Sequence, residues 1–471
     1  METEFEKLLN QAEETAGQLM ENSPEEVELR EIFLKDQKQG MFKIANYLIK
    51  NHNIKTISGE KNDDIYIYDN GVYVLNGKNT LKKEIAKILG SDRSSHYQSE
   101  IIGHIIGKTI VERENFDVKD GDLLCLNNGI LNIKVKELLP HSPEYLFKTK
   151  LPVSFSANAD CPKTKQFLSE VFYEDNIPVI QEWFGFCLLR EYLFKKAIIF
   201  VGSKNTGKST FLNLLIRLIG SDNVSGEDLC KLSTNRFSTI NLYGKLVNIY
   251  DDLSFRDLTD VGIFKMAVGR SMLRGEQKFK DNFLFYNYAK MTFSCNRIPT
   301  LKEKDYFDDA YYDRWIVIPM DNYIENKNAN LLKELTTEEE LSGLLNYSLV
   351  GLERLLLNKG FSIEENWEKT KKLMDMSGSP IACFVNDELI KSEDGAITKE
   401  EMFGAYCKYA QKNKYSATTI KKMGGSLVRF APYISDGRDK TGKQRAWRGV
   451  AFKNKEALSD APTITTIITD F

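Results

Sequence analysis

The sequence predicts an α/β protein with a parallel β-sheet at its centre, a mostly helical region before the sheet and a compact basic module after it. Three observations predict this class. Four short apolar runs lie within residues 195–320, as expected of strands buried in a parallel sheet. Apolar residues before residue 190 recur mostly with helical spacing. Residues 411–455 carry twelve Lys or Arg against two acidic residues, Asp436 and Asp439.

The composition is that of a soluble chain of about three domains. Of 471 residues, 42% are hydrophobic and 28% are charged, and no apolar run approaches the ~18 residues that a membrane span needs. The acidic N-terminus lacks an apolar stretch with a small-residue cleavage site, which argues against a secretory signal. Seven cysteines are scattered without a Cys-x-x-Cys pair. We therefore expect a reducing, cytoplasmic location and no structural zinc.

Histidine and charge restrict the chemistry further. All four histidines lie in the first third of the chain: His52, His96, His104 and His141. Histidine-based catalysis elsewhere is therefore excluded, and a metal ion there must be bound by oxygen ligands. The net charge of −3 is the sum of an acidic N-terminal end and a basic C-terminal end. The first thirty-one residues carry ten Glu against Lys7 and Arg30. We expect the basic C-terminal end to face nucleic acid, the plainer alternative being two solvated faces of opposite sign.

The chain divides by pattern into six regions. Residues 1–90 are predicted to be helical with a hairpin at residues 69–71, and residues 91–190 to form a helical, collar-like domain with a second hairpin at residues 127–129. The other regions are a central α/β domain (191–345), a helical connector (346–380), a basic module (381–456) and a flexible tail (457–471). The last residues of the connector, 376–380, are the candidate for a linker.

The most informative stretch is an apolar strand, Ala197–Val201, a glycine-rich loop and an amphipathic helix. The loop has the pattern Gly-x4-Gly-Lys-Ser and comprises Gly202, Ser203, Lys204, Asn205, Thr206, Gly207, Lys208, Ser209 and Thr210. Its glycines let successive N–H groups converge on the phosphates of ATP, and the helix N-terminus adds its positive end. Lys208 supplies a point charge and the Ser209 hydroxyl a ligand for Mg²⁺. The loop therefore predicts binding of ATP with Mg²⁺.

An acidic pair at the end of the next strand indicates hydrolysis. Residues 245–254 form a strand that ends in Asp251 and Asp252. One carboxylate would hold Mg²⁺, with Asp251 as the candidate, and the other would orient the attacking water. The sequence leaves open which residue takes which role. The alternative is an acidic pair that caps a turn.

Two further strands carry polar residues with expected roles. Asn296 ends an apolar strand, where its amide is placed to reach the γ-phosphate or the lytic water. Arg314 directly precedes a fourth apolar strand, a place from which we expect it to act across a subunit boundary as an arginine finger. The alternative for Arg314 is a surface ion pair with Asp313 or Asp309.

The order of these features resembles that of the superfamily 3 helicases, and within them the phage and plasmid primase-helicase branch related to the poxvirus primase-helicase. The resemblance leaves out only the first sixty or so residues. "WFGFCLLREYLFKKAIIFVG" (183–202) resembles the end of the helical domain ahead of the motor, and "TTIKKMGGSLVRFAPYI" (418–434) resembles part of a winged-helix module. The resemblance implies an AAA+ motor that assembles into a hexameric ring in the cytoplasm of a host cell.

One segment is similar to a motif particular to that superfamily. Residues 268–296 resemble the extra motif whose hairpin tip projects into the ring channel and grips one DNA strand. Lys278, Phe279 and Lys280 alternate cation, aromatic and cation, a combination suited to a phosphate backbone and a stacked base. A solvated charged hairpin is the alternative. In the C-terminal module the candidate DNA contacts are Lys421, Lys422 and Arg429.

The sequence departs from the family pattern in two places. The N-terminal region shows no set of metal-binding carboxylates of the kind a primase needs, so a separate primase or another replication protein is a candidate partner. Asp252 stands where many P-loop ATPases have Glu.

The leading hypothesis is an ATP-dependent helicase acting on single-stranded and forked DNA. The alternative is a replication initiator that recognises an origin duplex and uses ATP for assembly or melting. A small-molecule kinase would explain neither the hairpin segment nor the basic module.

Overall fold

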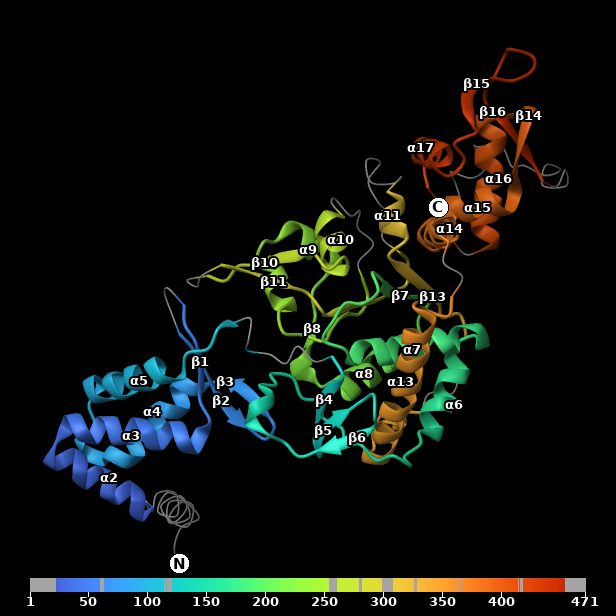
Figure 1. Cartoon of the computed structure of the whole chain (residues 1–471). Coiled ribbons are helices and arrows are strands. Elements are labelled where there is room, and N and C mark those ends of the chain that lie inside the picture. The colour runs from blue at the N-terminus through green and yellow to red at the C-terminus, as the bar shows by residue number, and fades with distance from the viewer. Residues whose placement is uncertain are drawn as a thin grey trace, which may run out of the picture.

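The computed structural model describes residues 23–59, 63–113, 116, 121–253, 261–278, 282–298, 308–325, 328–363, 366–413, 415 and 418–453. Within them the protein is a mixed α/β structure with a five-stranded parallel sheet. An N-terminal unit, a central body and a C-terminal module follow one another along an elongated molecule (Figure 1). In the described part of the chain, no helix combines the length and apolarity required to cross a membrane.

The N-terminal unit packs helices against a three-stranded antiparallel sheet. Its elements are α2 (Pro24–Lys35), α3 (Gln37–His52), β1 (Lys55–Ile57), β2 (Asp64–Asp69), β3 (Val72–Leu75), α4 (Gly77–Leu89), η1 (Gly90–Asp92) and α5 (Ser95–Thr109). The β2–β3 hairpin turns at Asn70 and Gly71, both with positive φ, where the sequence predicts it. The core of this unit runs from Leu29 to Ile105. Because α5 belongs to that core, the unit extends beyond the predicted boundary at residue 90.

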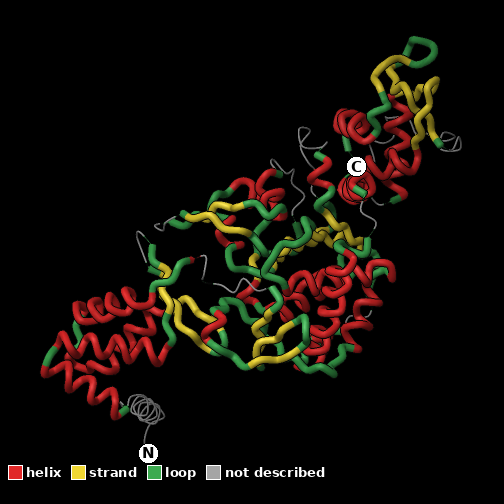
Figure 2. Tube along the Cα trace, viewed as in Figure 1, coloured by secondary structure: helices red, strands yellow, loops and turns green. Residues whose placement is uncertain are grey.

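A second antiparallel sheet and two helices follow. These elements are β4 (Leu123–Leu126), β5 (Gly129–Asn132), β6 (Glu137–Leu139), η3 (Pro143–Tyr145), α6 (Pro162–Val171), η4 (Glu174–Asn176) and α7 (Ile177–Leu188). The predicted second hairpin is the β4–β5 pair, in which Leu126 lies opposite Gly129. Residues 123–139 are therefore a sheet inside the region that was predicted to be helical (Figure 2).

The central body is built on the parallel sheet, with strand order β13-β7-β12-β9-β8. Its elements are β7 (Ala197–Val201), α8 (Lys208–Ile219), η5 (Ser221–Asn223), β8 (Val224–Ser225), α9 (Leu229–Thr234), η6 (Thr239–Leu242), β9 (Val247–Tyr250), α10 (Gly262–Val268), β10 (Met272–Gly275), β11 (Phe283–Tyr286), β12 (Lys290–Cys295), α11 (Asp309–Tyr312) and β13 (Trp315–Pro319). Strand β7 lies between β12 and β13, with Val201 beside Cys295 and Pro319. All four predicted apolar strands belong to this sheet.

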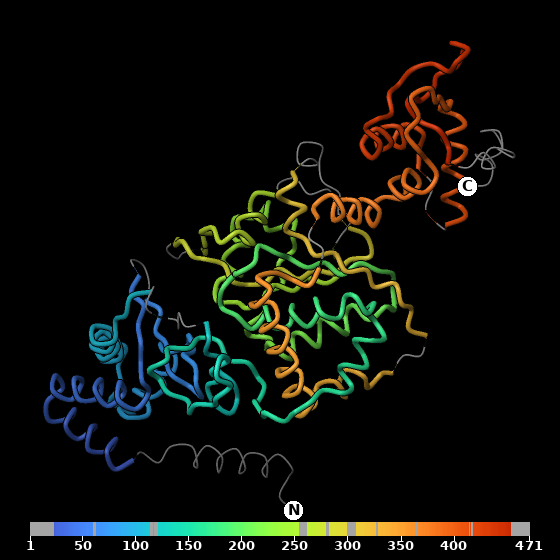
Figure 3. The backbone as a smooth tube through the Cα atoms, turned by 45° about the vertical axis from the view of Figure 1, so that its right-hand side comes forward, coloured from blue at the N-terminus to red at the C-terminus, as the bar shows by residue number. Residues whose placement is uncertain are grey.

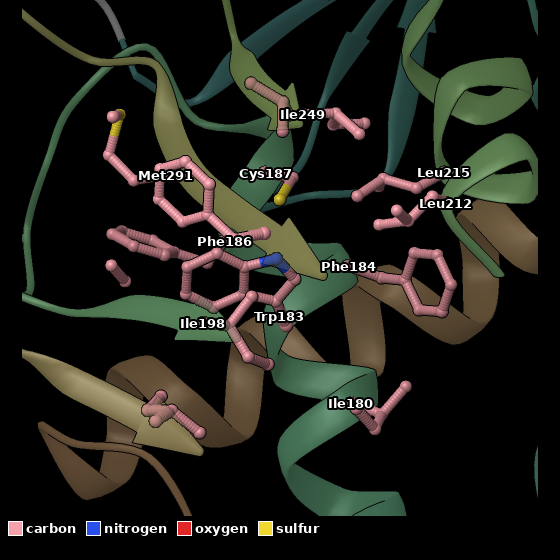
Figure 4. Close-up of a cluster of buried hydrophobic side chains, with 14 of the residues drawn as sticks. Ile180, Trp183, Phe184, Phe186, Cys187, Ile198, Leu212, Leu215, Ile249 and Met291 are labelled. Carbon is pink, nitrogen blue, oxygen red and sulfur yellow. The ribbon is translucent and has the colours of Figure 1, made fainter. Parts of the chain in front are cut away.

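Three helices follow the sheet: α12 (Leu331–Leu335), α13 (Glu338–Asn358) and α14 (Trp367–Gly378). Helix α13 packs against α7, and one hydrophobic core extends from Leu124 to Met374. Figure 4 shows part of this core around Trp183, whose indole Nε1 donates to Thr292 Oγ1 at 3.1 Å. The core crosses the predicted boundaries at residues 190 and 345. Helices before and after the sheet therefore belong to the same body as the sheet.

The contact between α7 and α13 depends on glycine. A Cβ atom added to Gly185 would overlap the Ser348 carbonyl oxygen and lie 2.7 Å from the Leu352 backbone nitrogen. A Cβ atom added to Gly351 would overlap the Gln181 carbonyl oxygen. The two helices approach backbone to backbone, and they are also joined by the buried Glu182 carboxylate, which accepts from Arg354 Nε at 2.6 Å.

The C-terminal module contains three helices and a three-stranded antiparallel sheet of order β14-β16-β15. Its elements are α15 (Pro380–Glu388), β14 (Leu389–Thr398), α16 (Lys399–Lys412), α17 (Ile420–Phe430), β15 (Ser435–Arg438) and β16 (Arg445–Phe452). The linker predicted at residues 376–380 is not extended. Helix α14 ends at Gly378 and α15 begins at Pro380, because Ser379 caps the second helix and Pro380 suits its first turn.

The glycine contact makes a prediction about stability. An alanine gains about 1 kcal/mol of helix propensity over glycine, whereas overpacking a close contact costs about 1–3 kcal/mol. Gly185→Ala should therefore lower the thermal unfolding midpoint, because the added methyl group pushes α7 away from α13. Gly103→Ala, at an exposed position of α5 with no atom within 4 Å of the added Cβ, should leave it unchanged or raise it. Unchanged stability of the Gly185→Ala protein in circular dichroism melts would contradict the close contact.

Candidate active site

The loop between β7 and α8 leaves no room for side chains at its two glycines. A Cβ atom on Gly202 would overlap the carbonyl oxygen of Met320, the residue that follows β13. Gly207 has a φ of +90° and would bring a Cβ atom 2.8 Å from Val171 on α6. The chain can make this turn against β13 and α6 only with glycine at both positions. Helix α8 starts directly after the turn, so its N-terminus points at the loop.

Lys208 lies across the loop at the carboxyl edge of the sheet. Its Nζ is 2.6 Å from the carbonyl oxygens of Gly202 and of Ser203, and 3.3 Å from Asn296 Oδ1. Burial lowers the pKa of Lys208, and the carboxylates of Asp251 and Asp252 oppose that shift. An ammonium held only by carbonyl and amide oxygens can turn to the oxygen atoms of a phosphate at little cost.

The acidic pair and the first turn of α8 meet at the same edge. Ser209 Oγ donates to Asp251 Oδ2 at 2.7 Å, and the other oxygen of Asp251 accepts from Ser294 on β12. Because a serine hydroxyl and a carboxylate are oxygen ligands of the kind that Mg²⁺ prefers, these two residues fit the metal ion of an ATP complex. No cluster of three or more His, Cys, Asp or Glu suited to a metal ion is found among the described residues. The remaining ligands would be phosphate oxygens and water.

Asp252 has an unusual backbone. Its φ is +58°, in the left-handed region that aspartate adopts only at a cost in energy. Its backbone N–H donates to Ser294 Oγ at 3.3 Å, and Asn296 Nδ2 lies 3.5 Å from Asp252 Oδ1. The strained turn directs Asp252 toward Asn296 and Asp251 toward Ser209. Asp251, beside Ser209, is therefore the residue of the pair that could hold a metal ion with it, whereas Asp252 faces Asn296.

The loop forms one side of a pocket of about 1000 Å³. Lys204 to Thr210, Asp251, Asp252 and Asn296 line the phosphate end. The sequence analysis does not predict the remaining lining residues. On α6 these are Lys163, Gln166, Phe167 and Glu170, and after β13 they are Ile324, Asn328, Ala329, Leu331 and Glu334. The α6 residues recur every three or four positions, which marks one helix face, but the sequence does not indicate what that face meets. A pocket of about 1000 Å³ is large enough to accept a nucleotide.

Arg314 lies at the other edge of the sheet. Strand β13 runs parallel to β7 with Trp315 beside Ala197, so Arg314 precedes both strands, roughly 16 Å along β13 from the phosphate loop. Its Nη1 donates to the carbonyl oxygen of Ala310 on α11. The structure thus brings together Lys208, Ser209, Asp251, Asp252 and Asn296 and leaves Arg314 apart from them.

The predicted DNA-gripping segment is a two-stranded hairpin, β10–β11, in which Met272 pairs with Tyr286 and Gly275 with Phe283. Lys278 is exposed near its tip, and Phe279 and Lys280 lie outside the described residues. A hollow of about 510 Å³ at the tip adds three residues that the sequence analysis missed, Arg236, Phe237 and Arg274. Thr239, two residues after Phe237, donates to the Arg274 carbonyl oxygen at 2.6 Å. Only the tertiary fold brings residues 236–237 to the hairpin.

In the C-terminal module the predicted contacts lie on α17. Lys421, Lys422 and Arg429 line a hollow of about 450 Å³ together with Thr419, Gly425 and Ser426. The two lysines are exposed, whereas Arg429 is half-buried. The three cations therefore share one face of the helix.

Two protein families and a number of solved structures are similar to this chain. Residues 7–173 match a family described as "D5 N terminal like", and residues 200–314 match a family of unknown function, DUF5906. Two apo structures of the NrS-1 C-terminal region are each 15% identical to this chain, with a TM-score of 0.48, and cover 87% of it and 98% or 99% of their own length. No curated protein matches.

The two family matches fall on different parts of the site. The first begins at residue 7 and so reaches into the sixty residues that the sequence resemblance left out; it also contains α6. The second contains the phosphate loop, the acidic pair, Asn296 and Arg314. The chain thus carries a D5 N terminal like segment and, after residues 174–199, the segment with all five candidate catalytic residues.

Proposed function

We propose that the protein is an ATP-dependent DNA helicase, a ring-forming AAA+ motor of superfamily 3 that moves along single-stranded DNA. The observation that carries the proposal is the convergence of Lys208, Ser209, Asp251, Asp252 and Asn296 at one end of a pocket of about 1000 Å³. A D5 N terminal like segment ahead of this site agrees with the resemblance to the primase-helicase branch.

Each group of pocket residues has its own role in the proposed hydrolysis. The N–H groups of the loop and Lys208 bind the β- and γ-phosphates and stabilise the charge that grows on them. Ser209 and Asp251 would hold Mg²⁺, which when bound neutralises phosphate charge. Asp252 accepts a hydrogen bond from the attacking water and orients it, and the Asn296 amide lies between that water and the γ-phosphate. Phe167 and its neighbours on α6 cover the nucleoside.

The position of Arg314 supports a ring. It is roughly 16 Å from the phosphate loop of its own chain, so it can stabilise transferred phosphate only in a neighbouring subunit. A head-to-tail contact of this kind, repeated with rotation, closes into a ring. We therefore propose that the active form is a homo-oligomer, a hexamer as the family resemblance implies, in which each pocket is completed by the partner.

The charged surfaces support DNA as the substrate. Three cations lie beside Phe237 in the hollow at the hairpin tip: Lys278, Arg236 and Arg274. The Arg274 guanidinium is 3.0 Å from the Glu276 carboxylate. This set suits a single strand, because cations follow its phosphates and an aromatic ring stacks on a base. In the C-terminal module the helix–strand–helix–helix–strand–strand order supports the winged-helix interpretation.

Replication initiation is the second candidate function. It is favoured by the cationic hollow on α17, which has the size and charge to accept a backbone phosphate of duplex DNA. Displacement of a labelled strand from forked DNA, compared with footprinting on a specific duplex, distinguishes the two functions. An initiator protects a defined duplex sequence without displacing the strand.

The phosphate site can be tested directly. Lys208→Ala should reduce ATP hydrolysis about 10²–10³-fold, because it removes a preorganised charge from the transferred phosphate. Arg217→Ala is the matched control, since Arg217 is an exposed cation at the far end of the same helix. It should retain wild-type turnover in a phosphate-release assay. Hydrolysis by the Lys208→Ala protein within a few-fold of wild type would exclude the proposed ATPase.

Arg314 allows a test of the ring. The Arg314→Ala protein should be inactive by itself. Mixed with Lys208→Ala protein it should regain hydrolysis, because some interfaces then pair an intact loop with an intact arginine. Turnover is measured across mixing ratios, with subunit exchange verified by fluorescence energy transfer. Absence of recovery despite exchange would contradict the trans role.

The hairpin hollow makes a third prediction. In the double variant Arg236→Ala/Lys278→Ala, single-strand affinity should fall, and the log–log salt dependence should flatten by about 0.7 per lost contact. Lys231→Ala, an exposed cation on α9 outside the hollow, should change neither. Fluorescence anisotropy across a salt series measures both quantities. If the double variant binds and unwinds like wild type, the strand is gripped elsewhere.

A further inference from the structure

Helix α11 leads directly into Arg314, and its conformation determines where that side chain lies. The Arg314 backbone N–H donates to the Tyr311 carbonyl oxygen at 3.2 Å, and the Arg314 guanidinium donates to the carbonyl oxygen of Ala310. Helix α11 is a single turn of four residues, and a helix that short makes too few internal hydrogen bonds to be stable by itself. The position of Arg314 therefore depends on the groups that hold α11 from outside.

Asp308 holds the start of α11 and is itself bound by Lys265 of α10. One oxygen of Asp308, Oδ1, accepts from the Tyr311 backbone N–H at 3.0 Å and so caps the helix. The other oxygen, Oδ2, is 2.5 Å from Lys265 Nζ. The side chains of Lys265 and Asp308 are 31% and 22% exposed, so solvent ions screen this ion pair less than one on the open surface.

Helix α10 also contacts the residue that follows Arg314. The buried ring of Phe264 is stacked on Trp315, with ring centroids 4.6 Å apart and an angle of 10° between the planes, and its centroid is 5.5 Å from that of Tyr311. Helices α10 and α11 lie side by side on the central body (Figures 1 and 3). Arg314 thus lies between two segments that α10 holds, one by the charge of Lys265 and the other by the ring of Phe264.

The ion pair is separate from the nucleotide pocket of its own chain. Among the described residues, neither Lys265 nor Asp308 lines that pocket, which is built from the phosphate loop, the acidic pair, Asn296, α6 and the segment after β13. Loss of the Lys265 charge should therefore leave the phosphate loop intact and disturb α11 and Arg314.

We propose that Lys265 is a positioning residue for ATP hydrolysis: through Asp308 it fixes α11, and α11 presents Arg314 to the pocket of the neighbouring subunit. This inference rests on the proposed function and adds to it a residue that orients the arginine. A defect in Lys265 then belongs to the subunit that supplies Arg314 and not to the subunit that binds the nucleotide.

Subunit mixing tests this assignment. Lys265→Met retains the apolar stem and removes the charge. By itself the variant should bind a fluorescent ATP analogue like the wild type and keep the KM for ATP. Its kcat should fall about tenfold to a hundredfold, because a displaced arginine stabilises the transferred phosphate poorly. Mixed with Lys208→Ala protein it should regain hydrolysis, since those subunits supply an intact Arg314 to its intact loop. Mixed with Arg314→Ala protein it should not.

Three further variants separate the ion pair from the fold of α11. Lys265→Arg keeps a cation that can bind Asp308 and should retain most of the turnover. Asp308→Asn keeps an oxygen that can cap α11 but loses the charge, and it should behave like Lys265→Met in both mixtures. Lys231→Met, at an exposed lysine of α9, which packs against α10, is the control and should hydrolyse ATP like the wild type.

The outcomes separate the two proposals. If the wild-type protein hydrolyses no ATP, or if Arg314→Ala and Lys208→Ala subunits exchange without recovery, the proposed function or its ring fails and this inference fails with it. If both results hold but Lys265→Met has wild-type turnover, or does not recover with Lys208→Ala protein, only the positioning role is overturned. A merely structural defect would lower analogue binding and the melting temperature and would recover in neither mixture, and that result also overturns the role.

Discussion

The hydrogen-bonded ladder of β7 with its two parallel neighbours is the constraint on which the rest of the structure depends. Pairing of Val201 with Cys295 and Pro319 makes all three strands end together. The phosphate loop, Asn296 and Met320 therefore emerge at one edge, where the Met320 carbonyl leaves Gly202 no room for a side chain. The same register pairs Trp315 with Ala197 and so places Arg314 at the other edge. One ladder therefore separates the residues proposed to bind the nucleotide from Arg314, which is proposed to act on a neighbouring subunit.

The pocket also depends on helices far from the loop in sequence. Val171 of α6 packs against Gly207, and the same helix lines the pocket. Helix α7 follows α6 and is held against α13 by the glycine contacts and by the bond between Glu182 and Arg354. A buried carboxylate needs such a partner, because an unpaired charge in a core is very costly. Helices that precede the sheet in the sequence and helices that follow it thus hold α6 in place at the pocket.

Charge acts locally in this protein. The net charge is −3, yet cations gather in the hollow at the hairpin tip and in the hollow on α17. Because solvent ions screen exposed charges over about 10 Å, the local cations of each hollow and not the net charge of the chain determine its potential.

The sequence by itself determined the local features: both hairpin turns, the four buried strands, the loop from Gly202 to Thr210, and the polar residues at the strand ends. Each of these depends on residues a few positions apart, where glycine, apolar period and capping act directly. Tertiary structure alone decided that α6 closes the pocket, that Arg236 and Phe237 lie beside Lys278, that Arg429 is half-buried, and that residues 376–380 join two helices without a linker. These depend on which surfaces pack together. The periodic pattern within one segment shows which of its faces is apolar or charged, but it does not show which distant segment that face packs against.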